Sequence, residues 1–469
     1  MPSSTRSAAT KKSTPKKATP KKSTTKKSTT KTTAKKQDRT ELIIEVLTDA
    51  FAPLMKADPV AFRVKFRKMA ADPFAFYRGS ACLFYADVTP LDDPWVNEEC
   101  ARIWIHGDLH AENFGTYLNS SGRLVFDIND FDEAYIGHYT WDLMRFCASL
   151  GLLGWQKALP EAEVRRLIGR YLRAYLAQLN HYVSKDDDED YALRLDNTTG
   201  PVHEALMEAR LMRRADLLSA ITVRDGVERT FQEGPGTRRL TKAEQDKVLA
   251  SFAGYLESIP ESKRFDRDLF YEVVDLVGSS GFGIGSAGLP AYSVLVEGTS
   301  QALDNDVVLS MKQANIPAVS RFVDRGQVER YFEHEGHRTV ISQRALQVHT
   351  DPLLGYTTFD GTGYVVSEVS PYEVDLDWSG ISEPSDIASV VDLLGRATAK
   401  VHCASDEDSD QDLVDFQVEE SIAAAIKGRR REFTEAMVEF GISYAATVRE
   451  DHRLFVEAFR EGRIGVSAT

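Results

Sequence analysis

The chain has 469 residues and a formal net charge of -14 at pH 7, and its 42% hydrophobic and 27% charged residues are typical of a globular protein with two or three core-bearing units. Its four cysteines, Cys82, Cys100, Cys147 and Cys403, are widely scattered, which argues against a zinc site or a disulfide framework. No apolar run approaches the roughly 18 residues that span a bilayer, so we expect a cytoplasmic protein with no membrane partner.

The first 37 residues differ from the rest of the chain. They hold eleven lysines and Arg6 but no acidic residue, and Ser, Thr, Ala and Pro separate the charges. Because no large apolar residue follows Met1, nothing offsets the conformational entropy of folding, and we expect residues 1–37 to be disordered. The composition resembles the lysine-rich tails of linker histones and favours nucleic-acid binding. A solubilising tail that lies on the acidic body is the alternative.

Apolar residues at helical spacing predict a helix over residues 39–72, directly after the tail. Residues 74–79 and 102–105 are expected to be short extended segments around a loop. After an NSSGR turn, residues 124–128 have the pattern of a strand. The polar segment HGDLHAENFG, residues 106–115, is therefore predicted to lie in a loop between two strands.

This loop holds more titratable groups than ordinary core requires, which marks it as a candidate site. Asp108 and Asn113 are five residues apart in it, and Asp127 and Asp130 lie at the end of the next strand. Phosphoryl transfer uses such a set, because one carboxylate orients the accepting hydroxyl while an amide oxygen and a second carboxylate hold Mg²⁺ on the nucleotide phosphates.

The arrangement resembles the aminoglycoside-phosphotransferase and choline-kinase branch of the protein-kinase-like fold. The catalytic loop of that branch reads H-G-D-x-x-x-x-N, which is matched by His106, Gly107, Asp108 and Asn113. Its metal-binding strand reads I-D-W-x-x-A-x-x-G followed by D-L, which is matched by Asp130, Ala134, Gly137, Asp142 and Leu143, with Phe131 in place of the tryptophan.

The resemblance implies a role for each of the main positions. Asp108 is the catalytic aspartate, Asn113 and Asp130 bind the metal, and Asp142 braces the loop. His106 belongs to the same catalytic group, where we expect it to hydrogen-bond the loop backbone.

Two alternatives remain open for these residues. Asp127 lies on the same strand and competes with Asp130 for the metal. His106 and His110 have the i, i+4 spacing of a metal-binding pair, although the segment offers no further ligands for a catalytic zinc.

The block that follows is predicted to be mostly helical, and a sheet comes later in the chain. Periodicity predicts helices at residues 141–153, 161–179 and 201–222. After residue 265, β-like runs lie at 273–277, 291–297, 307–312 and 363–369, with one helix at about 327–349 among them. Further helices are expected at 385–402 and 421–459.

A glycine pattern, G-x-G-x-x-G, lies between two of these strands at Gly283, Gly285 and Gly288. A dinucleotide-binding fold would begin a helix at the third glycine, whereas here a strand continues, as in the loop that covers the ATP phosphates in kinases. The next strand ends in VVLSMKQA, which places Lys312 where the lysine that pairs with the phosphates is expected. A flexible hairpin and a surface lysine are the alternatives.

The order of these motifs is reversed relative to a kinase. The helix at 385–402 looks like the helix that leads into the catalytic loop in kinases, so the fold is circularly permuted if its end lies beside residues 102–105. The permuted order resembles the uncharacterised bacterial proteins grouped as domain of unknown function 2252. The matching segments are PFAFYRGSA, GDLHAENFG, FDINDFDEA, WDLMRFCASL, GIGSAGLPAYSVLVEG, LSMKQA and QRALQ.

Two features of the predicted sheet region match this family less well. A Val-Ser pair stands where that family usually carries Arg-Gln, and the next residue, Glu368, is the candidate for the adenine side of the site. The partner of Lys312 is expected in the helix that follows. Glu335 is the preferred candidate there, and Glu333 and Gln343 are the alternatives.

Together these features predict an α+β, protein-kinase-like fold of two lobes that is circularly permuted. Residues 265–380 form the small β lobe, and residues 38–264 and 381–469 form the helical large lobe. ATP and Mg²⁺ are expected between the lobes. The predicted reaction is transfer of the γ-phosphoryl group to an unidentified hydroxyl acceptor, which is a small molecule or a protein.

Other functions remain open. The same motifs suit an ATP-binding pseudokinase or sensor, and the same fold suits an enzyme that transfers AMP. The basic tail suits association with nucleic acid. The acidic body favours a cationic acceptor such as an aminoglycoside or a choline, although acidity of this size also simply keeps a protein dispersed.

Overall fold

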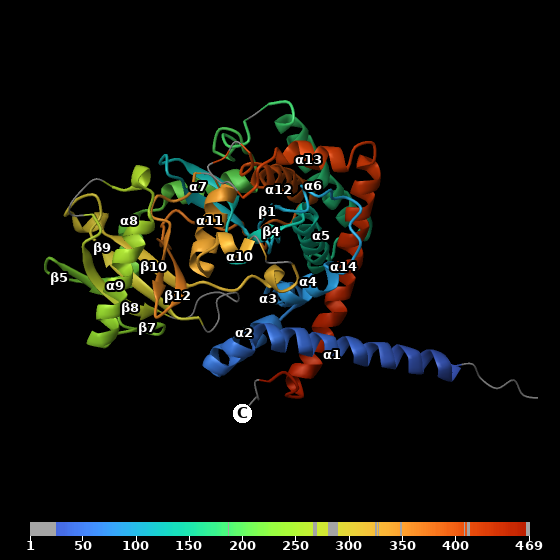
Figure 1. Ribbon diagram of the computed structural model, residues 1–469, viewed down its shortest axis with the longest axis horizontal. Helices are drawn as coiled ribbons and strands as arrows, with labels where there is room; N and C mark the ends of the chain where they lie inside the picture. The colour runs from blue at the N-terminus through green and yellow to red at the C-terminus, as the bar shows by residue number, and fades with distance from the viewer. Residues whose placement is uncertain are drawn as a thin grey trace, which may run out of the picture.

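The computed structural model has two lobes, one a bundle of helices and the other built on a sheet (Figure 1). It describes residues 25–465 except for residue 186 and residues 266–269, 280–288, 324–325, 327, 348, 408 and 410–412. Helices hold 51% of the chain and strands hold 15%, so the predicted α+β class is confirmed. Gly283, Gly285 and Gly288 lie outside the described residues.

The helical lobe is formed by two separate parts of the chain. The first part comprises Thr25–Ala57 (α1), Pro59–Met69 (α2), Pro73–Gly79 (α3), Ala81–Val88 (α4), Tyr139–Gln156 (α5), Glu161–Tyr182 (α6) and Pro201–Leu211 (α7). The second part follows the sheet and comprises Pro384–Cys403 (α12), Val418–Ala425 (α13) and Arg430–Arg460 (α14). Because α12 packs along α6 and α14 packs along α5, both parts share one core.

Four short strands within the helical lobe carry the predicted motifs. Ile103–Ile105 (β1) pairs antiparallel with Tyr135–Gly137 (β4), and Phe114–Leu118 (β2) pairs antiparallel with Leu124–Ile128 (β3). The loop position predicted for HGDLHAENFG is therefore confirmed, because residues 106–113 connect β1 to β2.

The other lobe contains a six-stranded antiparallel sheet in the order β11-β12-β10-β9-β8-β7. Its strands are Thr237–Arg238 (β7), Val273–Ser279 (β8), Ala291–Val296 (β9), Val307–Gln313 (β10), Gly355–Phe359 (β11) and Thr362–Glu368 (β12). Short 3-10 turns lie at Glu261–Lys263, Leu303–Asn305 and Ala318–Arg321.

Helices cover both faces of this sheet. Lys242–Ser258 (α9) packs on one face, and Arg214–Ile221 (α8) with the hairpin of Thr222–Asp225 (β5) and Glu228–Phe231 (β6) packs on part of the other. Two further helices, Val328–Tyr331 (α10) and Glu335–Gln347 (α11), follow β10. Helix α11 contacts β11 and β12 as well as α12, β1 and β4, so it lies between the two lobes (Figure 1).

Alternation along β10 decides which way Lys312 faces. Leu309 and Met311 belong to the core beneath α9, whereas Val308 belongs to the core on the opposite face. Residues two apart in a strand share a face. Lys312 therefore lies on the face of Val308, away from α9.

Two predictions at the beginning of the helical lobe are wrong, and Asp-Pro pairs explain both. The helix predicted over residues 39–72 is interrupted, because Asp58 accepts hydrogen bonds from two backbone amides of α2, at 2.9 and 3.1 Å. Residues 74–79, predicted to be extended, form α3, because Asp72 caps that helix and Pro73 occupies its first position. An aspartate cap followed by proline is a signal for the start of a helix.

The predicted extent of the helical lobe also needs correction. Helix α1 begins at Thr25, within the predicted tail. Its later turns bury Ile43 and Leu47, and extending an anchored helix requires no new nucleus. Residues 214–259, predicted to belong to the helical lobe, instead pack on the sheet through the buried side chains of Leu218, Phe231, Val248, Phe252, Tyr255 and Ile259.

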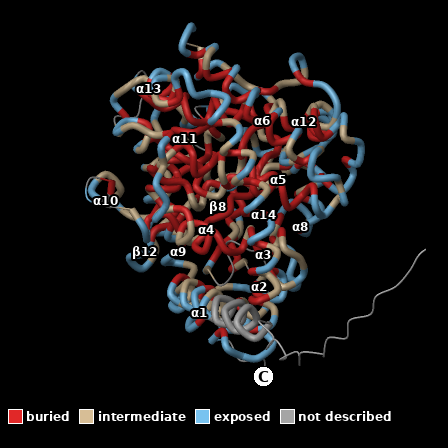
Figure 2. Tube along the Cα trace, turned by 90° about the vertical axis from the view of Figure 1, so that its right-hand side faces the viewer, coloured by how far each residue is buried: buried red, intermediate tan, exposed pale blue. Residues whose placement is uncertain are grey.

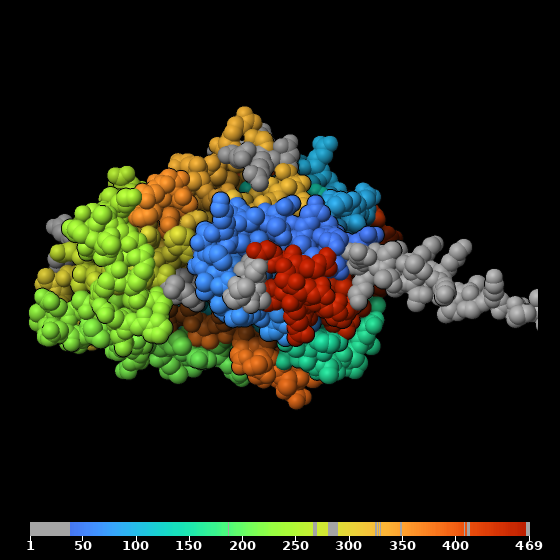
Figure 3. All heavy atoms as spheres, turned by 90° about the horizontal axis from the view of Figure 1, so that it is seen from below, coloured from blue at the N-terminus to red at the C-terminus, as the bar shows by residue number. Residues whose placement is uncertain are grey.

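The C-terminal part of α14 lies against α1 on one face of the molecule (Figure 3). Arg39 of α1 pairs with Asp451 of α14 at 2.5 Å and with Asp87 of α4 at 2.6 Å. Figure 2 shows buried segments at the centre of the molecule and α1 at its rim. These contacts fasten α1, and with it α2, to the helical lobe.

Candidate active site

The loop between β1 and β2 is held by the side chain of Asp142, at the start of α5. One carboxylate oxygen accepts the backbone N–H of His106 at 2.7 Å, and the other accepts that of Gly107 at 3.0 Å. His402, in the last turn of α12, lies 3.3 Å from the same carboxylate. The bracing role predicted for Asp142 is confirmed by these contacts.

Gly107 gives this loop its close approach to the residues after β3. Its φ is 79°, and a Cβ at this position would lie 2.1 Å from the carbonyl oxygen of Glu133. Only glycine adopts such a conformation without strain. Tyr85 of α4 donates to the Gly107 carbonyl at 2.7 Å and fixes the peptide from the other side.

His106 is buried beneath the loop and uses both ring nitrogens there. Nε2 donates to the carbonyl of Asn129 at 2.8 Å, and Nδ1 accepts the backbone N–H of Asp108 at 3.3 Å. Burial lowers the pKa of His106, so the ring is neutral. Its membership of the catalytic group therefore needs correction, because this side chain positions the loop and has no free nitrogen to offer a substrate.

Asp108 is bound by the guanidinium of Arg145, a residue of α5 to which no motif assigned a role. Arg145 is fully buried, its guanidinium lies 4.3 Å from the centre of the Tyr77 ring, and it donates to the Tyr77 carbonyl at 3.1 Å. Burial raises the pKa of Asp108 to about 7, and the charge of Arg145 opposes that rise. A carboxylate with a pKa near neutrality is suited to accept a proton at neutral pH.

Asn113 and Asp130 line the floor of a cleft, and Asp108 lies next to them, in a small pocket that opens beside Asp130. Nδ2 of Asn113 donates to the Asp108 carbonyl at 2.9 Å, which leaves the amide oxygen as its metal-binding atom. Asp130 has φ of 61°, unusual for a residue with a side chain, and is exposed to the cleft. Its enclosed position raises its pKa, and the charges of Lys312 and Arg78 oppose the rise.

The arrangement of Asn113 and Asp130 suits a metal ion that binds together with nucleotide phosphates. Within the part of the chain that the structure describes, no three His, Cys, Asp or Glu side chains are grouped to hold an ion. A kinase-type Mg²⁺ needs less from the protein, because phosphate oxygens complete its coordination around one carboxylate and one amide oxygen. Asn113 and Asp130 fit that requirement.

Asp127 is turned away from the cleft, so its prediction as a metal ligand is wrong. One carboxylate oxygen lies 2.5 Å from Nζ of Lys400, and the other accepts the backbone N–H of Ile128 at 2.9 Å. Lys400 also donates to the carbonyl of Leu346 at 3.0 Å. Both charged side chains are buried. The pair joins β3 to α12 and is structural.

Lys312 lies across the cleft from this floor, at the end of β10. Its charge opposes the rise in pKa of Asp130, Asp132 and Glu373, which places its ammonium among these carboxylates. The pKa of Asp132 is raised to about 6 and that of Glu373 to about 7, chiefly because the surrounding protein desolvates the two carboxylates. Lys312 lies at the end of a strand, as predicted, and its pairing with phosphates stays a prediction.

The two glutamates predicted to contact lysine or nucleotide are engaged with arginines. Glu335 accepts a hydrogen bond from Nε of Arg338 at 2.6 Å, in place of its predicted pairing with Lys312. Arg338 is buried and donates to the Ala134 carbonyl at 2.6 Å, which ties α11 to the segment after β3. Glu368 lines the cleft and forms an ion pair with Arg214 of α8, and its predicted contact with adenine stays a prediction.

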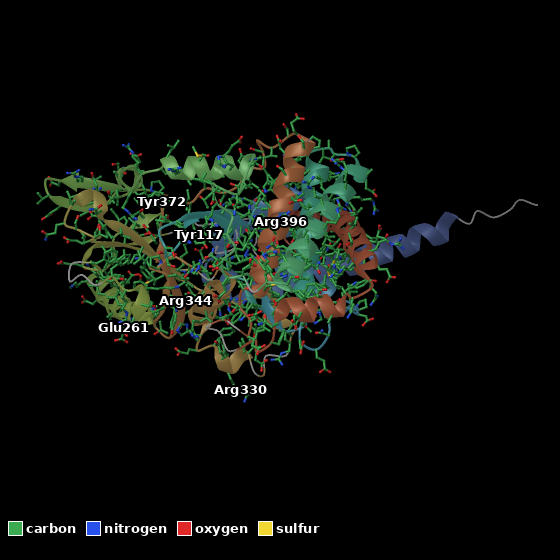
Figure 4. The ribbon with its side chains drawn as sticks, turned by 90° about the horizontal axis from the view of Figure 1, so that it is seen from above. Tyr117, Glu261, Arg330, Arg344, Tyr372 and Arg396 are labelled. Atoms are coloured by element: carbon green, nitrogen blue, oxygen red, sulfur yellow. The ribbon has the colours of Figure 1, made fainter. Side chains whose placement is uncertain are left out.

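The cleft between the lobes has a volume of about 470 Å³, within the range of small-molecule sites. Its lining includes Asn113, Asp130, Lys312, Thr339, Gln343, Gln347, Asp351, Ser367, Glu368 and Glu373. One wall is built where the chain after β12 runs along β2, and the backbone N–H of Thr116 donates to the Val374 carbonyl at 3.0 Å. Tyr117 of β2 and Tyr372 of the passing segment lie in this region (Figure 4).

Three buried cations shape the site and were missed by sequence reasoning. Arg145 binds Asp108, Arg338 holds the segment after β3, and Lys400 neutralises Asp127. Two of them are charged residues among mostly apolar neighbours, in WDLMRF around Arg145 and ATAKV around Lys400. Lysine and arginine are almost never fully buried unless paired, so this pattern was the available signal.

The fold and the site define an α+β protein with two lobes and a carboxylate-rich cleft between them. The chain belongs to the family described as uncharacterized protein conserved in bacteria (DUF2252), whose model matches residues 57–458. The basic N-terminal segment lies outside the matched residues. No curated protein and no solved structure matches the chain. Among the described helices, none has the length and apolar character to cross a bilayer.

Proposed function

We propose that the protein is a Mg²⁺- and ATP-dependent phosphotransferase with a circularly permuted, protein-kinase-like architecture. The observation that carries the proposal is that Asn113, Asp130 and Lys312 line the cleft while Asp108 lies next to Asp130, in the small pocket that opens beside it. A base, two metal-binding oxygens and a phosphate-pairing cation are the groups that phosphoryl transfer requires.

The contacts of α12 support the permuted order. His402, near the end of this helix, contacts Asp142, and Asp142 binds the first two backbone amides of the catalytic loop. The helix that follows the sheet in the chain thus ends beside a loop that precedes the sheet by more than a hundred residues. In an unpermuted kinase the corresponding helix would continue directly into this loop.

The residues suggest a simple course for the reaction. The acceptor hydroxyl oxygen attacks the γ-phosphorus, the bond from this phosphorus to the bridging oxygen breaks, and ADP leaves with that electron pair. Asp108 orients the hydroxyl and accepts its proton, which then passes to solvent. Mg²⁺, held by Asn113 and Asp130, would offset negative charge on the phosphates. Lys312 would pair with the same phosphates.

One contact favours a second candidate, an ATP-binding protein without transfer activity. The guanidinium of Arg145 occupies Asp108 in this structure. A base that stays paired with a buried arginine accepts protons poorly, which suits a sensor that binds nucleotide and changes shape.

A labelling experiment separates these functions. The protein is incubated with Mg²⁺ and ATP labelled in either the γ- or the α-phosphate, with a bacterial small-molecule extract as the source of acceptors. We expect product labelled from γ-labelled ATP alone, and none with Asp108→Asn. Product labelled from α-labelled ATP would show AMP transfer instead. Nucleotide binding without any labelled product would favour the sensor.

A further inference from the structure

A small second pocket opens from the cleft on the side of Asp108. Its volume is about 50 Å³, and its lining includes Lys65, Cys82, Asp108, Glu133 and Arg321. It shares three lining residues with the large cleft, Arg78, Asp130 and Asp132. The two spaces therefore meet at the proposed metal position, and Asp108 faces the smaller one.

Lys65 of α2 extends into this pocket from the core. Its side chain is 3% exposed, and Nζ lies 4.1 Å from the centre of the Phe51 ring and 5.6 Å from that of Phe62. Among the described residues, Glu133 and Asp108 act on this ammonium through their charges, without a hydrogen bond. A buried ammonium normally has a hydrogen-bonding partner, because its desolvation is costly.

The ammonium of Lys65 remains largely charged at neutral pH. Burial lowers its pKa to about 8, and the negative charges of Glu133 and Asp108 favour the charged form. At pH 7 the protonated form therefore predominates, and the pocket presents a cation at its inner end.

Several other charged side chains that line the small pocket are already engaged, whereas Asp130 and Asp132 lie where it meets the cleft. The contacts are Asp108 with Arg145, Glu133 with Asn315 and the backbone amide of Ala318, and Arg78 with Glu112. Arg321, at the rim, donates to the Ala50 carbonyl at 3.1 Å and is otherwise exposed. Among the described residues, Lys65 and Arg321 are thus the cations of this pocket that form no ion pair.

We propose that the small pocket binds an anionic group of the phosphoryl acceptor, with Lys65 as its counter-ion and Arg321 at the rim. The acceptor is then a hydroxyl compound that carries a carboxylate or a phosphate group, and the hydroxyl lies at Asp108. This inference rests on the proposed phosphotransferase function, because it names the substrate class of the same site.

The size of the pocket agrees with this class. One water needs roughly 10–15 Å³ of such space, so about 50 Å³ holds roughly three to five non-hydrogen atoms, the size of one carboxylate or phosphate group. A cationic acceptor, which the acidic composition favoured, would place like charge beside Lys65.

Thermal melting tests the anion site without requiring turnover. The full chain is melted with saturating Mg²⁺-ADP, which fills the cleft, and with or without millimolar inorganic phosphate, glycerate or choline. We expect phosphate or glycerate to raise the melting temperature of the wild type and choline to leave it unchanged. Whichever anion acts identifies the group as phosphate or carboxylate.

Two lysines of the same helix give a matched pair of variants. Lys65→Met should abolish the anion-dependent rise and keep the ADP-dependent rise, whereas Lys68→Met, at an exposed position, should keep both. An equal anion-dependent rise in Lys65→Met would overturn the proposal, as would the lack of any anion effect on the wild type. An anion-dependent rise that needs Lys65 but comes without an ADP effect would support the anion site and count against the phosphotransferase.

Turnover gives a second readout. With γ-labelled ATP, we expect label to enter glycerate or glycerol 3-phosphate, and the acceptor KM to rise at least tenfold in Lys65→Met while the KM for ATP stays unchanged. Label that enters choline or kanamycin, and neither anionic alcohol, would overturn the assignment of the acceptor class.

Discussion

Two aspartates three residues apart, Asp127 and Asp130, face opposite sides of the same strand end and have opposite environments. Asp127 is buried against Lys400 at 2.5 Å, behind β3. Asp130 is exposed to the cleft, near Lys312. The ion pair of Asp127 with Lys400, here called the closed side, joins β3 to α12. The cleft that Asp130 and Lys312 line, here called the open side, has the size of a nucleotide site. Burial and contacts, rather than residue type, separate the structural aspartate from the candidate metal ligand.

The largest effect is expected on the open side, at Asp108. Asp108→Asn should lower turnover by about 10²–10⁴-fold, the usual contribution of a general base. Binding of Mg²⁺-ATP should change less than about twofold, because Asp108 faces the small pocket and not the cleft. Initial rates and titration calorimetry measure the two quantities. Unchanged turnover would remove Asp108 from the reaction.

On the closed side the expected effect is on stability. Lys400→Met leaves Asp127 buried without its cation, which should lower the free energy of unfolding by about 3–5 kcal/mol. Lys312→Met, in the open cleft, should cost about 1 kcal/mol or less but weaken nucleotide binding. Urea unfolding of both variants measures the difference. Equal losses of unfolding free energy in the two variants would contradict the assignment of Lys400 to a structural ion pair and of Lys312 to the cleft.

The pH dependence of the reaction rate tests the role of Asp108 as the base. The pKa of Asp108 is about 7, and the base must be deprotonated to accept a proton. The rate should therefore fall about tenfold for each pH unit below 7 and level off above it. In Arg145→Met the charge that lowers the pKa of Asp108 is lost, so the pH at which the rate begins to fall should be higher. A rate independent of pH between 5 and 8 would contradict the assignment.

The smallest effect is expected at Glu335. Because its carboxylate pairs with Arg338 at 2.6 Å, Glu335→Gln should change the affinity for Mg²⁺-ATP by less than about twofold, within the range of a partly exposed ion pair. Titration calorimetry provides the measurement. A tenfold loss of affinity would restore Glu335 as the partner of Lys312.

Much of the site could be predicted from local pattern. Asp108, Asn113, Asp130 and Asp142 have fixed spacings within one short stretch, and the apolar run VVLSMKQA placed Lys312 at the end of a strand. The helix starts at Asp58 and Asp72 also carried a readable signal, an aspartate followed by proline, that periodicity alone overlooked.

The remainder depends on contacts between distant parts of the chain. Lys400 is 273 positions from Asp127, and no spacing rule links them. Arg338 competes for Glu335 because α11 presses against the segment after β3, which is visible only in three dimensions. The same holds for Lys65, whose position beside Asp108 results from the packing of α2 on the helical lobe.

The most direct test of the central claim is the effect of Mg²⁺-ATP on the melting temperature of the wild type, Asp130→Asn and Asp127→Asn. A ligand that binds only the folded protein stabilises it by about 2.7 kcal/mol at one hundred times its dissociation constant. We expect a clear rise in the wild type and in Asp127→Asn, and none in Asp130→Asn. No rise in the wild type, or an equal rise in Asp130→Asn, would contradict a metal-nucleotide site at the floor of this cleft.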